Sequence, residues 1–480
     1  MPLRKVYLVL VLCLLLAAQS HGQKRPNIIF ILTDDQAAWA QGQYQGSQAI
    51  TPNMDRIAQE GVYLSNAFVV TPVCSPSRAS LLTSRYGYEL GIDDWINEKG
   101  RSLTGIEPGL GIDAALPTWP KALAKAGYHT GLIGKWHLGS LDESHPTVLG
   151  YQEFSGFREG GTKTENPIFE IKGESQQMNG LTEDLLTDLA LEFVDNHQSS
   201  PFALSLHFRA PHTNWLPVRP EDAAPFKSKN ISIPEPNFPD LDTARTKSMM
   251  RDYLSSVKCV DRNLGRLLNR LDSLGLAENT ILIFTSDHGY NMGHNGIWHK
   301  GNGHWLLNHP VASPNPNIPV DQRPNLYDNS LRVPAMIRWP GKIQPGTVLN
   351  HTVANIDWYP TILDMVGVTI PLQDTIRGKS FNQFLLGKSS GQRWDEDLFA
   401  VYTTKHQSKT QMRMYRTNKY KLIRDFLNPE RDEFYDLESD PQEHINLIHS
   451  TDKRIIAQIK TLDKRLSQRM INNNDPLKHP

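Results

Sequence analysis

Four short apolar runs recur along the chain, separated by stretches with helical spacing. The runs read NIIFIL at 27–32, HTGLIG at 129–134, FALSLHF at 202–208 and ILIFTS at 281–286. The intervening segments 115–127, 181–197 and 248–274 place their apolar residues at the spacing of helices. Short strands that alternate with helices indicate βαβ units. We therefore predict an α/β fold with a large, mostly parallel central sheet flanked by helices.

Each apolar run is followed at once by polar residues of unusual chemistry. Ligands of such sheets bind beyond the carboxyl ends of the strands, so these residues should gather at one edge. Any single set has a plainer explanation, as a turn, a helix cap, a solvated strand end or a loop histidine. The coincidence of four sets favours one common site, made of Asp34 and Asp35, Lys135 and His137, Arg209 and His212, and Asp287 and His288.

Three residues of this predicted site are carboxylates, namely Asp34, Asp35 and Asp287. Bringing them together is costly unless a cation compensates their charge. Oxygen ligands favour a hard metal, and Ca²⁺ suits an irregular site of high coordination. Zinc is disfavoured because the sequence has no HExxH and no paired-cysteine spacing. His288 either donates a hydrogen bond beside the metal or binds it directly, and both readings stay open.

Cations and histidines complete the predicted chemistry. Arg78, Lys135 and Lys300 could hold a tetrahedral oxyanion. His137 and His212 could pass protons to and from a nucleophile and a leaving group. A metal, cations and histidines around one point indicate an ester hydrolase that acts on an anionic group.

The candidate nucleophile lies in the stretch TPVCSPSRASLLTSR at 71–85. Beyond residue 22 the chain has two cysteines, Cys74 and Cys259, and in an exported protein such a pair could form a disulfide. Cys259 falls in the helical segment 248–274, whereas Cys74 lies in a Pro- and Ser-rich stretch with an arginine close behind. We therefore expect a chemical role for Cys74 in place of a bridge.

The motif CSPSR at 74–78 resembles the signature of the type I sulfatases, in which the cysteine of C-x-P-x-R is converted to formylglycine. The resemblance runs from residue 25 to 447 and includes, in the family's order, RPNIIFILTDDQ, GKWHLG, APH, LGLAENTILIFTSDHG, LYDNSLRVPAMIRWPG and FYDLESDPQEHINL. It implies an alkaline-phosphatase-like fold, a sulfuric ester hydrolase activity and one Ca²⁺ ion. It also implies a sulfatase-maturing enzyme as the partner that modifies Cys74.

The resemblance implies a role for each matching residue. The formylglycine from Cys74 would, as its hydrate, attack sulfur and later release sulfate from a covalent hemiester, and Arg78 would steady it. His137 would assist that release, and His212 would protonate the departing alcohol. Lys135 and Lys300 would hold the sulfate oxygens, and the calcium ligands would be Asp34, Asp35, residue 74, Asp287 and His288.

The segment that follows Lys300 is longer than in many family members. It is either a surface loop with ordinary aromatic anchors or a wall of the substrate pocket whose tryptophans stack on sugar rings. The second interpretation adds four residues to the predicted substrate site of Lys135, His212 and Lys300, namely Trp298, His299, His304 and Trp305.

The two ends of the chain differ from its centre. Residues 1–22 have the pattern of a secretory signal peptide, so we expect an exported protein, periplasmic or secreted, without a membrane anchor.

We predict a catalytic domain at 23–385 and a C-terminal subdomain at 386–480. In the latter, LFAVYTT, QMRMYRTN and KYKLIRDF predict a smaller antiparallel sheet, and 452–471 a closing helix. The formal net charge of −1 gives no general attraction to nucleic acid.

These features together predict hydrolysis of sulfate esters on a sulfated polysaccharide or oligosaccharide. One alternative is a phosphonate or phosphate monoester hydrolase of the same superfamily. The other is a catalytically inactive protein that binds sulfated glycans. The presence of Cys74, Arg78, Lys135, His137 and His212 together favours sulfate hydrolysis.

Overall fold

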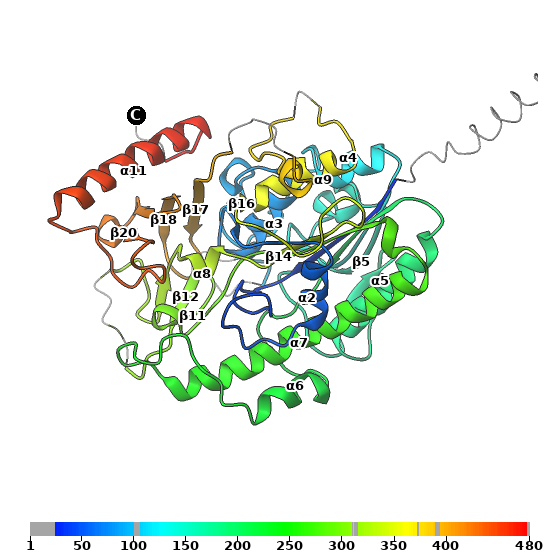
Figure 1. Ribbon diagram of the computed structural model, residues 1–480, viewed down its shortest axis with the longest axis horizontal. Coiled ribbons are helices and arrows are strands. Elements are labelled where there is room, and N and C mark those ends of the chain that lie inside the picture. The colour runs from blue at the N-terminus through cyan, green and yellow to red at the C-terminus, as the bar shows by residue number, and fades with distance from the viewer. Residues whose placement is uncertain are drawn as a thin grey trace, which may run out of the picture.

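The computed structural model describes residues 25–99, 106–309, 311, 315–371, 374–388 and 394–477, so the predicted signal peptide lies outside the described residues. A ten-stranded sheet forms the centre of the molecule (Figure 1). From edge to edge its strands are β15 (Thr347–Leu349), β2 (Val62–Leu64), β14 (Ala335–Arg338), β9 (Thr280–Ser286), β1 (Asn27–Thr33), β8 (Phe202–His207), β4 (His129–Lys135), β5 (Glu153–Phe157), β6 (Ile168–Ile171) and β7 (Glu174–Gln177).

The four apolar runs of the sequence are four adjacent strands of this sheet. β9, β1, β8 and β4 lie side by side, and all run parallel. In register, Leu32 of β1 pairs with Thr285 on one side and with His207 on the other. β5 continues the parallel set, while β14 and β6 pair antiparallel to it. The predicted α/β class and the mostly parallel sheet are therefore confirmed.

Successive side chains of β1 enter two separate cores. Ile28, Phe30 and Leu32 pack on one face of the sheet, and Ile29 and Ile31 pack on the other, as the alternation of a strand requires. The first core is covered by α3 (Cys74–Thr83), α4 (Trp119–Lys125) and α9 (Trp358–Met365). The second core is covered by α2 (Pro52–Gln59), α5 (Thr182–His197), α6 (Pro220–Lys227) and α7 (Thr243–Ser273).

The helix α7 shows why the sequence pattern is readable. Asp242 caps its first turn by accepting a hydrogen bond from the backbone N–H of Arg245, and Gly275 follows its last turn with a φ of +66°. The helix begins five residues before the predicted segment 248–274, because polar residues fill its first turns. No helix among the described residues is long and apolar enough to cross a membrane.

The C-terminal part forms a separate four-stranded sheet with a helix against it (Figure 1). Its strands β17 (Leu398–Thr404), β18 (Thr410–Arg416), β19 (Tyr420–Asp425) and β20 (Glu433–Asp436) are all antiparallel, and α11 (Lys453–Asn472) follows them. The predicted strands and closing helix are confirmed, whereas the predicted boundary at 385 stays a prediction. Met412 and Leu422 belong to the same core as β1, so the two sheets share one hydrophobic interior.

Several short elements complete the fold. A second four-stranded sheet comprises β10 (Asn291–Met292), β11 (Ile297–His299), β12 (Asn302–Trp305) and β13 (Gln322–Pro324). A two-stranded sheet pairs β3 (Ala67–Phe68) with β16 (Val353–Ala354), and α8 (Asp328–Leu331) and α10 (Asn382–Leu385) are single helical turns.

Candidate active site

The predicted polar residues meet at the carboxyl edge of the parallel strands. Asp34 and Asp35 follow β1, Asp287 and His288 follow β9, and Lys135 is the last residue of β4. All five are buried, with at most 2% of their surface exposed. Since β9, β1, β8 and β4 are neighbours, the sheet itself brings these segments together from distant parts of the sequence.

Cys74 reaches this edge from the other side, as the first residue of α3. Its sulfur lies 2.9 Å from Nζ of Lys300 and 3.4 Å from Nε2 of His288. Burial raises the pKa of the thiol, but the charges of Lys135 and Lys300 more than offset this and lower the pKa to about 5. The position therefore favours an anionic or electron-rich group, as a nucleophile requires. Cys74 and Cys259 are both buried, free thiols in the structure.

Each buried carboxylate has a cation of its own. Lys135 lies 2.5 Å from Asp34, and Lys300 lies 2.7 Å from Oδ1 of Asp35. The guanidinium of Arg78 donates to Oδ2 of Asp287 at 2.9 Å. These pairs compensate much of the charge, which is why three carboxylates can lie together in a buried site.

One carboxylate oxygen of Asp35 is left without a partner by these ion pairs. Oδ2 of Asp35 is buried and has no hydrogen-bond partner among the described residues. Burial raises the pKa of this carboxyl to about 6, with Lys300 opposing the shift. A buried carboxylate oxygen without a partner costs free energy, and a bound cation would supply the missing contact.

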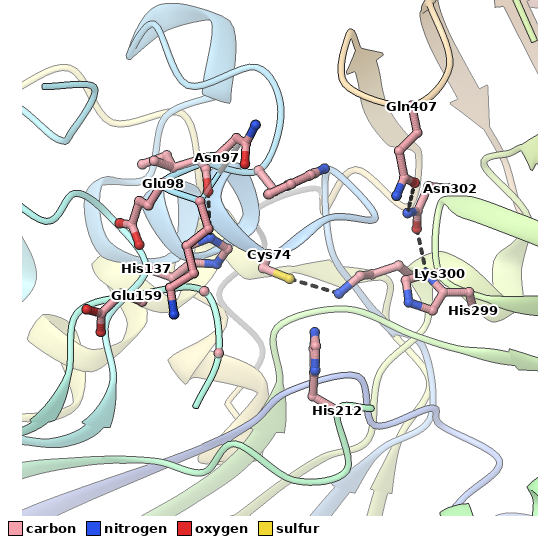
Figure 2. Close-up of a pocket in the computed structure, with 15 residues that line it drawn as sticks. Cys74, Asn97, Glu98, His137, Glu159, His212, His299, Lys300, Asn302 and Gln407 are labelled. Atoms are coloured by element: carbon pink, nitrogen blue, oxygen red, sulfur yellow. Dashed lines mark hydrogen bonds between the residues drawn. The ribbon is translucent and has the colours of Figure 1, made fainter. Parts of the chain in front are cut away.

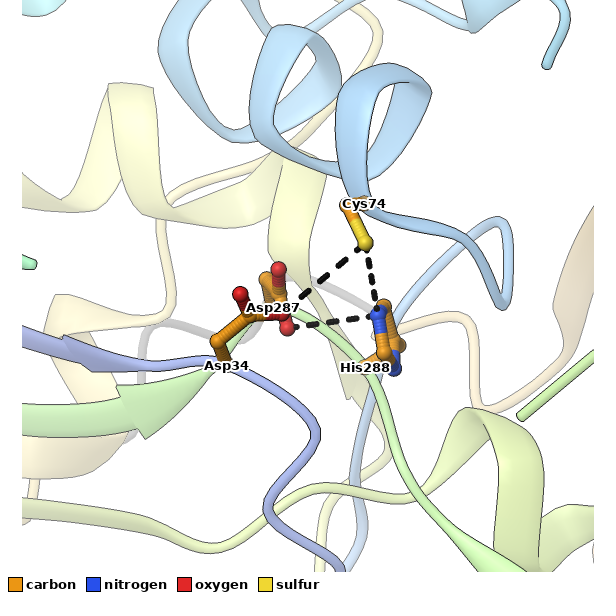
Figure 3. Close-up of side chains that lie close together, drawn as sticks. All are labelled: Asp34, Cys74, Asp287 and His288. Carbon is orange, nitrogen blue, oxygen red and sulfur yellow. Dashed lines mark hydrogen bonds and ion pairs between the residues drawn. The ribbon is translucent and has the colours of Figure 1, made fainter. Parts of the chain in front are cut away.

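A metal ion has a ready set of ligands at this point. Ligand atoms of Asp34, Cys74, Asp287 and His288 all lie within 4.8 Å of one another (Figure 3). Nδ1 of His288 lies 3.0 Å from the carbonyl oxygen of Gly289, which can only accept, so Nδ1 carries a proton. Burial lowers the pKa of His288, but the charges of Asp287 and Asp35 more than offset this and raise it to about 9, so without a metal Nε2 is protonated beside these carboxylates. A bound cation would replace that proton and take the lone pair of Nε2. The oxygen-rich set fits a hard divalent cation, with His288 able to bind it directly.

The two predicted proton carriers are oriented by backbone carbonyls. Nε2 of His137 donates to the carbonyl oxygen of Ile96 at 3.2 Å, which leaves Nδ1 buried and without a partner among the described residues. Nδ1 of His212 donates to the carbonyl oxygen of Thr213 at 2.6 Å, so Nε2 is the nitrogen left to exchange a proton. Burial lowers the pKa of both imidazoles well below the usual value, and both are therefore neutral in the free protein.

A cavity of about 570 Å³ opens onto Cys74 (Figure 2). The predicted residues Cys74, His137, His212, His299 and Lys300 line it. Lys135 does not line the cavity; it lies beneath the site against Asp34. The cavity therefore gives a substrate access to the nucleophile position, one lysine and both candidate proton carriers.

Besides Lys135, three of the predicted substrate contacts lie outside the lining of this cavity, namely Trp298, His304 and Trp305. Trp298 packs at 6.3 Å from Trp215, and cross-strand pairing places it beside His304. Trp305 pairs across the strands with Ile297 and packs against the core that contains Phe30 of β1. The hairpin of β11 and β12 instead reaches the cavity with its turn, through His299, Lys300 and Asn302.

Other lining residues have no signal in the sequence. Trp95 supplies an aromatic ring, held edge-on against His406 with ring centroids 4.7 Å apart. The further polar lining residues that sequence reasoning missed are Asn97, Glu98, Lys99, Glu159, Asn302 and Gln407. Most come from irregular segments after α3, β5 and β17, where no apolar spacing marks an inward-facing side chain.

Arg209 holds the loop that carries His212. Its guanidinium donates to the carbonyl oxygens of His212 at 2.9 Å and Asn214 at 2.8 Å, and its Nε donates to that of Thr162. Glu183 accepts from the backbone N–H of Ala210 at 2.9 Å in the same loop. Both residues therefore position His212 without touching the cavity.

Several known proteins are similar to this chain over most of its length. The family model described as Sulfatase matches residues 26–368, and a second, described as N-sulphoglucosamine sulphohydrolase, C-terminal, matches residues 320–472. An N-acetylglucosamine-6-O-sulfatase of Bacteroides thetaiotaomicron is 30% identical, over 95% of this chain and 89% of that protein. An ulvan-active sulfatase of Formosa agariphila is 27% identical, over 96% of this chain and 84% of the relative.

Solved structures of similar proteins share the fold of this chain. One, determined in complex with its substrate D-glucosamine-2-N,6-O-disulfate, has a TM-score of 0.79 at 27% identity, covering 95% of this chain and 99% of the other. A putative sulfatase of Bacteroides fragilis has the same TM-score at 22% identity, over 95% of this chain and 98% of its own, and supports the fold.

Proposed function

The chain belongs to the sulfatase family, and on that premise we propose that it removes sulfate from a sulfated sugar, with residue 74 in its formylglycine form. The observation that carries this proposal is the position of Cys74. Its side chain faces the cavity, next to a lysine, a histidine and a carboxylate.

Two groups would complete the site. Conversion of Cys74 would supply a geminal diol, in which one hydroxyl can attack sulfur and the second permits release of sulfate. A Ca²⁺ ion would be held by Asp34, Asp35, Asp287 and His288, and would add fixed positive charge beside the nucleophile.

The chain's own residues would do the rest. Lys300 lines the cavity with its ammonium group 2.9 Å from the sulfur of Cys74, so it can bind a sulfate oxygen there. Arg78 donates to the carbonyl oxygen of Lys135 at 3.2 Å and to Asp287, which fixes the end of β4 against α3. Lys135 then keeps Asp34 charged and in place beneath the reacting group.

Proton transfer falls to the two histidines. Nε2 of His212 would carry the proton to the departing sugar oxygen, because Nδ1 is committed to Thr213. The neutral imidazole of the free protein must first gain that proton, and the bound sulfate would favour this by adding negative charge beside it. Nδ1 of His137, which has no partner among the described residues, would accept the proton that leaves the second hydroxyl.

We propose a 6-O-sulfated glucosamine unit as the first substrate to test. This choice is supported by the N-acetylglucosamine-6-O-sulfatase relative and by the solved neighbour that binds a glucosamine disulfate. Export through the segment 1–22 stays a prediction, as does the sulfatase-maturing enzyme as partner.

Mass spectrometry of the tryptic peptide from Ile57 to Arg78 tests the proposal, on protein produced together with a sulfatase-maturing enzyme. We expect formylglycine at residue 74, and release of inorganic sulfate from sulfated glucosamines but not by Cys74→Ala. Unmodified cysteine, alongside conversion of a control sulfatase, would contradict the mechanism. Faster hydrolysis of a phosphate ester than of the matching sulfate ester would support the phosphatase alternative instead.

A further inference from the structure

Two histidines and a glutamate meet at the opposite edge of the large sheet. His129 is the first residue of β4, Glu153 is the first residue of β5, and His197 is the last residue of α5 (β5 and α5 are labelled in Figure 1). Nε2 of His129 lies 2.7 Å from Oε1 of Glu153, and Nε2 of His197 lies 2.8 Å from the same oxygen. The three ligand atoms all lie within 4.8 Å of one another.

The imidazole rings pack against each other and against Phe193. They stack with centroids 3.8 Å apart and an angle of 18° between their planes. Phe193 packs against both rings, at 5.8 Å from His129 and 4.6 Å from His197. Both Nε2 atoms contact the same carboxylate oxygen. Because the rings are nearly parallel, one ring must tilt out of the stack for both lone pairs to face a single ion.

We propose that His129, Glu153 and His197 form a binding site for a transition metal ion, with Zn²⁺ as the ion that the ligand set fits. Two imidazoles and one carboxylate are a common zinc set, and water would complete the tetrahedron. Nitrogen ligands favour zinc over Ca²⁺, which prefers oxygen. This site does not depend on the proposed function.

The present distances are close to those that zinc needs. Bonds of about 2.0 to 2.2 Å at tetrahedral angles separate neighbouring ligand atoms by about 3.3 Å. The observed contacts of 2.7 and 2.8 Å are hydrogen bonds, so the carboxylate would have to retreat by roughly half an ångström. The side chain of Glu153 is 50% exposed and free to make that movement.

The site is remote from the proposed active site. His129 and Lys135 are the two ends of β4, and six residues of strand span about 20 Å. Zinc at His129 would therefore leave the cavity around Cys74 unchanged. Substitutions there should likewise leave sulfate release unaltered.

A neighbouring pair provides a matched control. Nε2 of His145 lies 2.9 Å from Oε1 of Glu170. Among the residues that the structure describes, this carboxylate has one imidazole partner, and Arg158 occupies its other oxygen at 2.9 Å. One imidazole beside a guanidinium is a poor metal site, because the cation repels the ion. His145→Gln removes a histidine–carboxylate contact of the same kind without removing a ligand of the proposed site.

Isothermal titration of Zn²⁺ into the full chain tests the proposal, with Ca²⁺ in excess to fill the oxygen-rich site. We expect wild type and His145→Gln to bind one zinc ion that His129→Gln and His197→Gln bind at least tenfold more weakly. The variants are compared with each other, so any zinc taken by Cys74 and its neighbours cancels. Equal zinc stoichiometry and affinity in wild type and both ligand variants would overturn the proposal.

Thermal unfolding provides a second measurement. Zinc should raise the Tm of wild type and of His145→Gln, but not the Tm of Glu153→Gln, since only the folded state assembles the three ligands. Far-UV circular dichroism without zinc checks that each variant is folded. If one histidine variant does not fold, the other histidine variant and Glu153→Gln decide the question, and an unchanged zinc shift in those two would overturn the proposal.

Discussion

The ammonium group of Lys300 lies 2.9 Å from the sulfur of Cys74, although 226 residues separate them in the chain. The same ammonium lies 2.7 Å from Oδ1 of Asp35. One cation therefore touches both the nucleophile position and a carboxylate of the predicted metal site. Removal of the Lys300 side chain should therefore affect both the nucleophile position and the predicted metal site.

We expect Lys300→Ala to lower kcat/KM for a sulfate ester by about a hundredfold or more, because the charge that binds the sulfate oxygen would be lost from a buried site. The measurement is steady-state release of sulfate, on protein whose formylglycine content is determined by mass spectrometry. Lys99→Ala is the matched control, since Lys99 also lines the cavity but lies on its outer, exposed part. A similar loss in both variants would contradict a specific role for Lys300.

Removal of the metal should destabilise the protein and stop turnover together. Without a cation, three carboxylates stay buried in one place, and the side chains of Lys135, Lys300, Arg78 and His288 compensate their charge incompletely; the carboxylates are those of Asp34, Asp35 and Asp287. We expect a chelator to lower the Tm and abolish sulfate release, and added Ca²⁺ to restore both. A ligand at a thousandfold excess over its Kd stabilises by about 4 kcal/mol, which corresponds to several degrees in Tm.

Variants of the ligands give a sharper form of this test. His288→Asn keeps a polar side chain beside the carboxylates and should retain part of the Ca²⁺ effect on Tm. Asp287→Asn removes a buried charge and also frees Arg78, so it should eliminate that effect. Unchanged calcium stabilisation in Asp287→Asn would place the metal elsewhere.

The sequence is sufficient to predict the strands and the polar residues at their ends. The run NIIFIL must be buried, and the sheet then fixes where Asp34 and Asp35 lie, because parallel strands end at a common edge. Formylglycine chemistry could be expected from CSPSR alone. These features are local in the chain, and a sequence pattern records them directly.

The residues that form the walls of the cavity come from distant parts of the sequence, and they could not be predicted. Trp95 and Gln407 both line the cavity, although they come from segments more than 300 residues apart. Trp298 is turned toward Trp215 by the register of β11 and β12, which no sequence pattern reveals. The proton position on His288 likewise depends on one carbonyl oxygen, that of Gly289, which only the folded loop brings within reach.

We expect a carboxylate in the cavity wall, that of Glu98, to make the preference between substrates depend on pH. Burial raises the pKa of Glu98 to about 7, and the neighbouring charge of Glu159 contributes (Figure 2). Below that pH Glu98 is neutral, and above it the side chain repels a second anionic group on the sugar. We expect the ratio of kcat/KM for a disulfated over a monosulfated glucosamine to fall several-fold as the pH rises from 6 to 8.

Titration of the catalytic groups affects kcat/KM of both substrates equally. It therefore cancels in the ratio of the two kcat/KM values. Glu98→Gln should flatten the dependence, and Glu159→Gln should shift it to lower pH by removing the charge that holds the pKa of Glu98 up. A ratio that stays constant with pH in the wild type would show that Glu98 does not face the second anionic group.

A buried group of charges around Asp328 joins the C-terminal sheet to the rest of the fold. This carboxylate lies 3.0 Å from Arg416 of β18 and 2.9 Å from Lys421 of β19, and Lys421 also pairs with Glu443 at 2.6 Å. Burial opposes the charge on Asp328, but Arg416 and Lys421 more than offset this and hold its pKa well below the usual 3.8. A carboxyl with a lowered pKa stabilises the fold above its unfolded value and loses that stabilisation as the pH falls below it.

We therefore expect Asp328→Asn to cost about 3 to 5 kcal/mol at pH 7, because Arg416 and Lys421 would stay buried with less compensation. Part of the wild-type loss of stability below pH 4 should disappear in this variant. Urea unfolding at pH 7 and at pH 3.5 measures both effects. Glu438→Gln is the control, since its pair with Lys419 is exposed and should contribute nothing measurable. Equal stability of the two variants would show that the charges around Asp328 do not hold the C-terminal sheet in place.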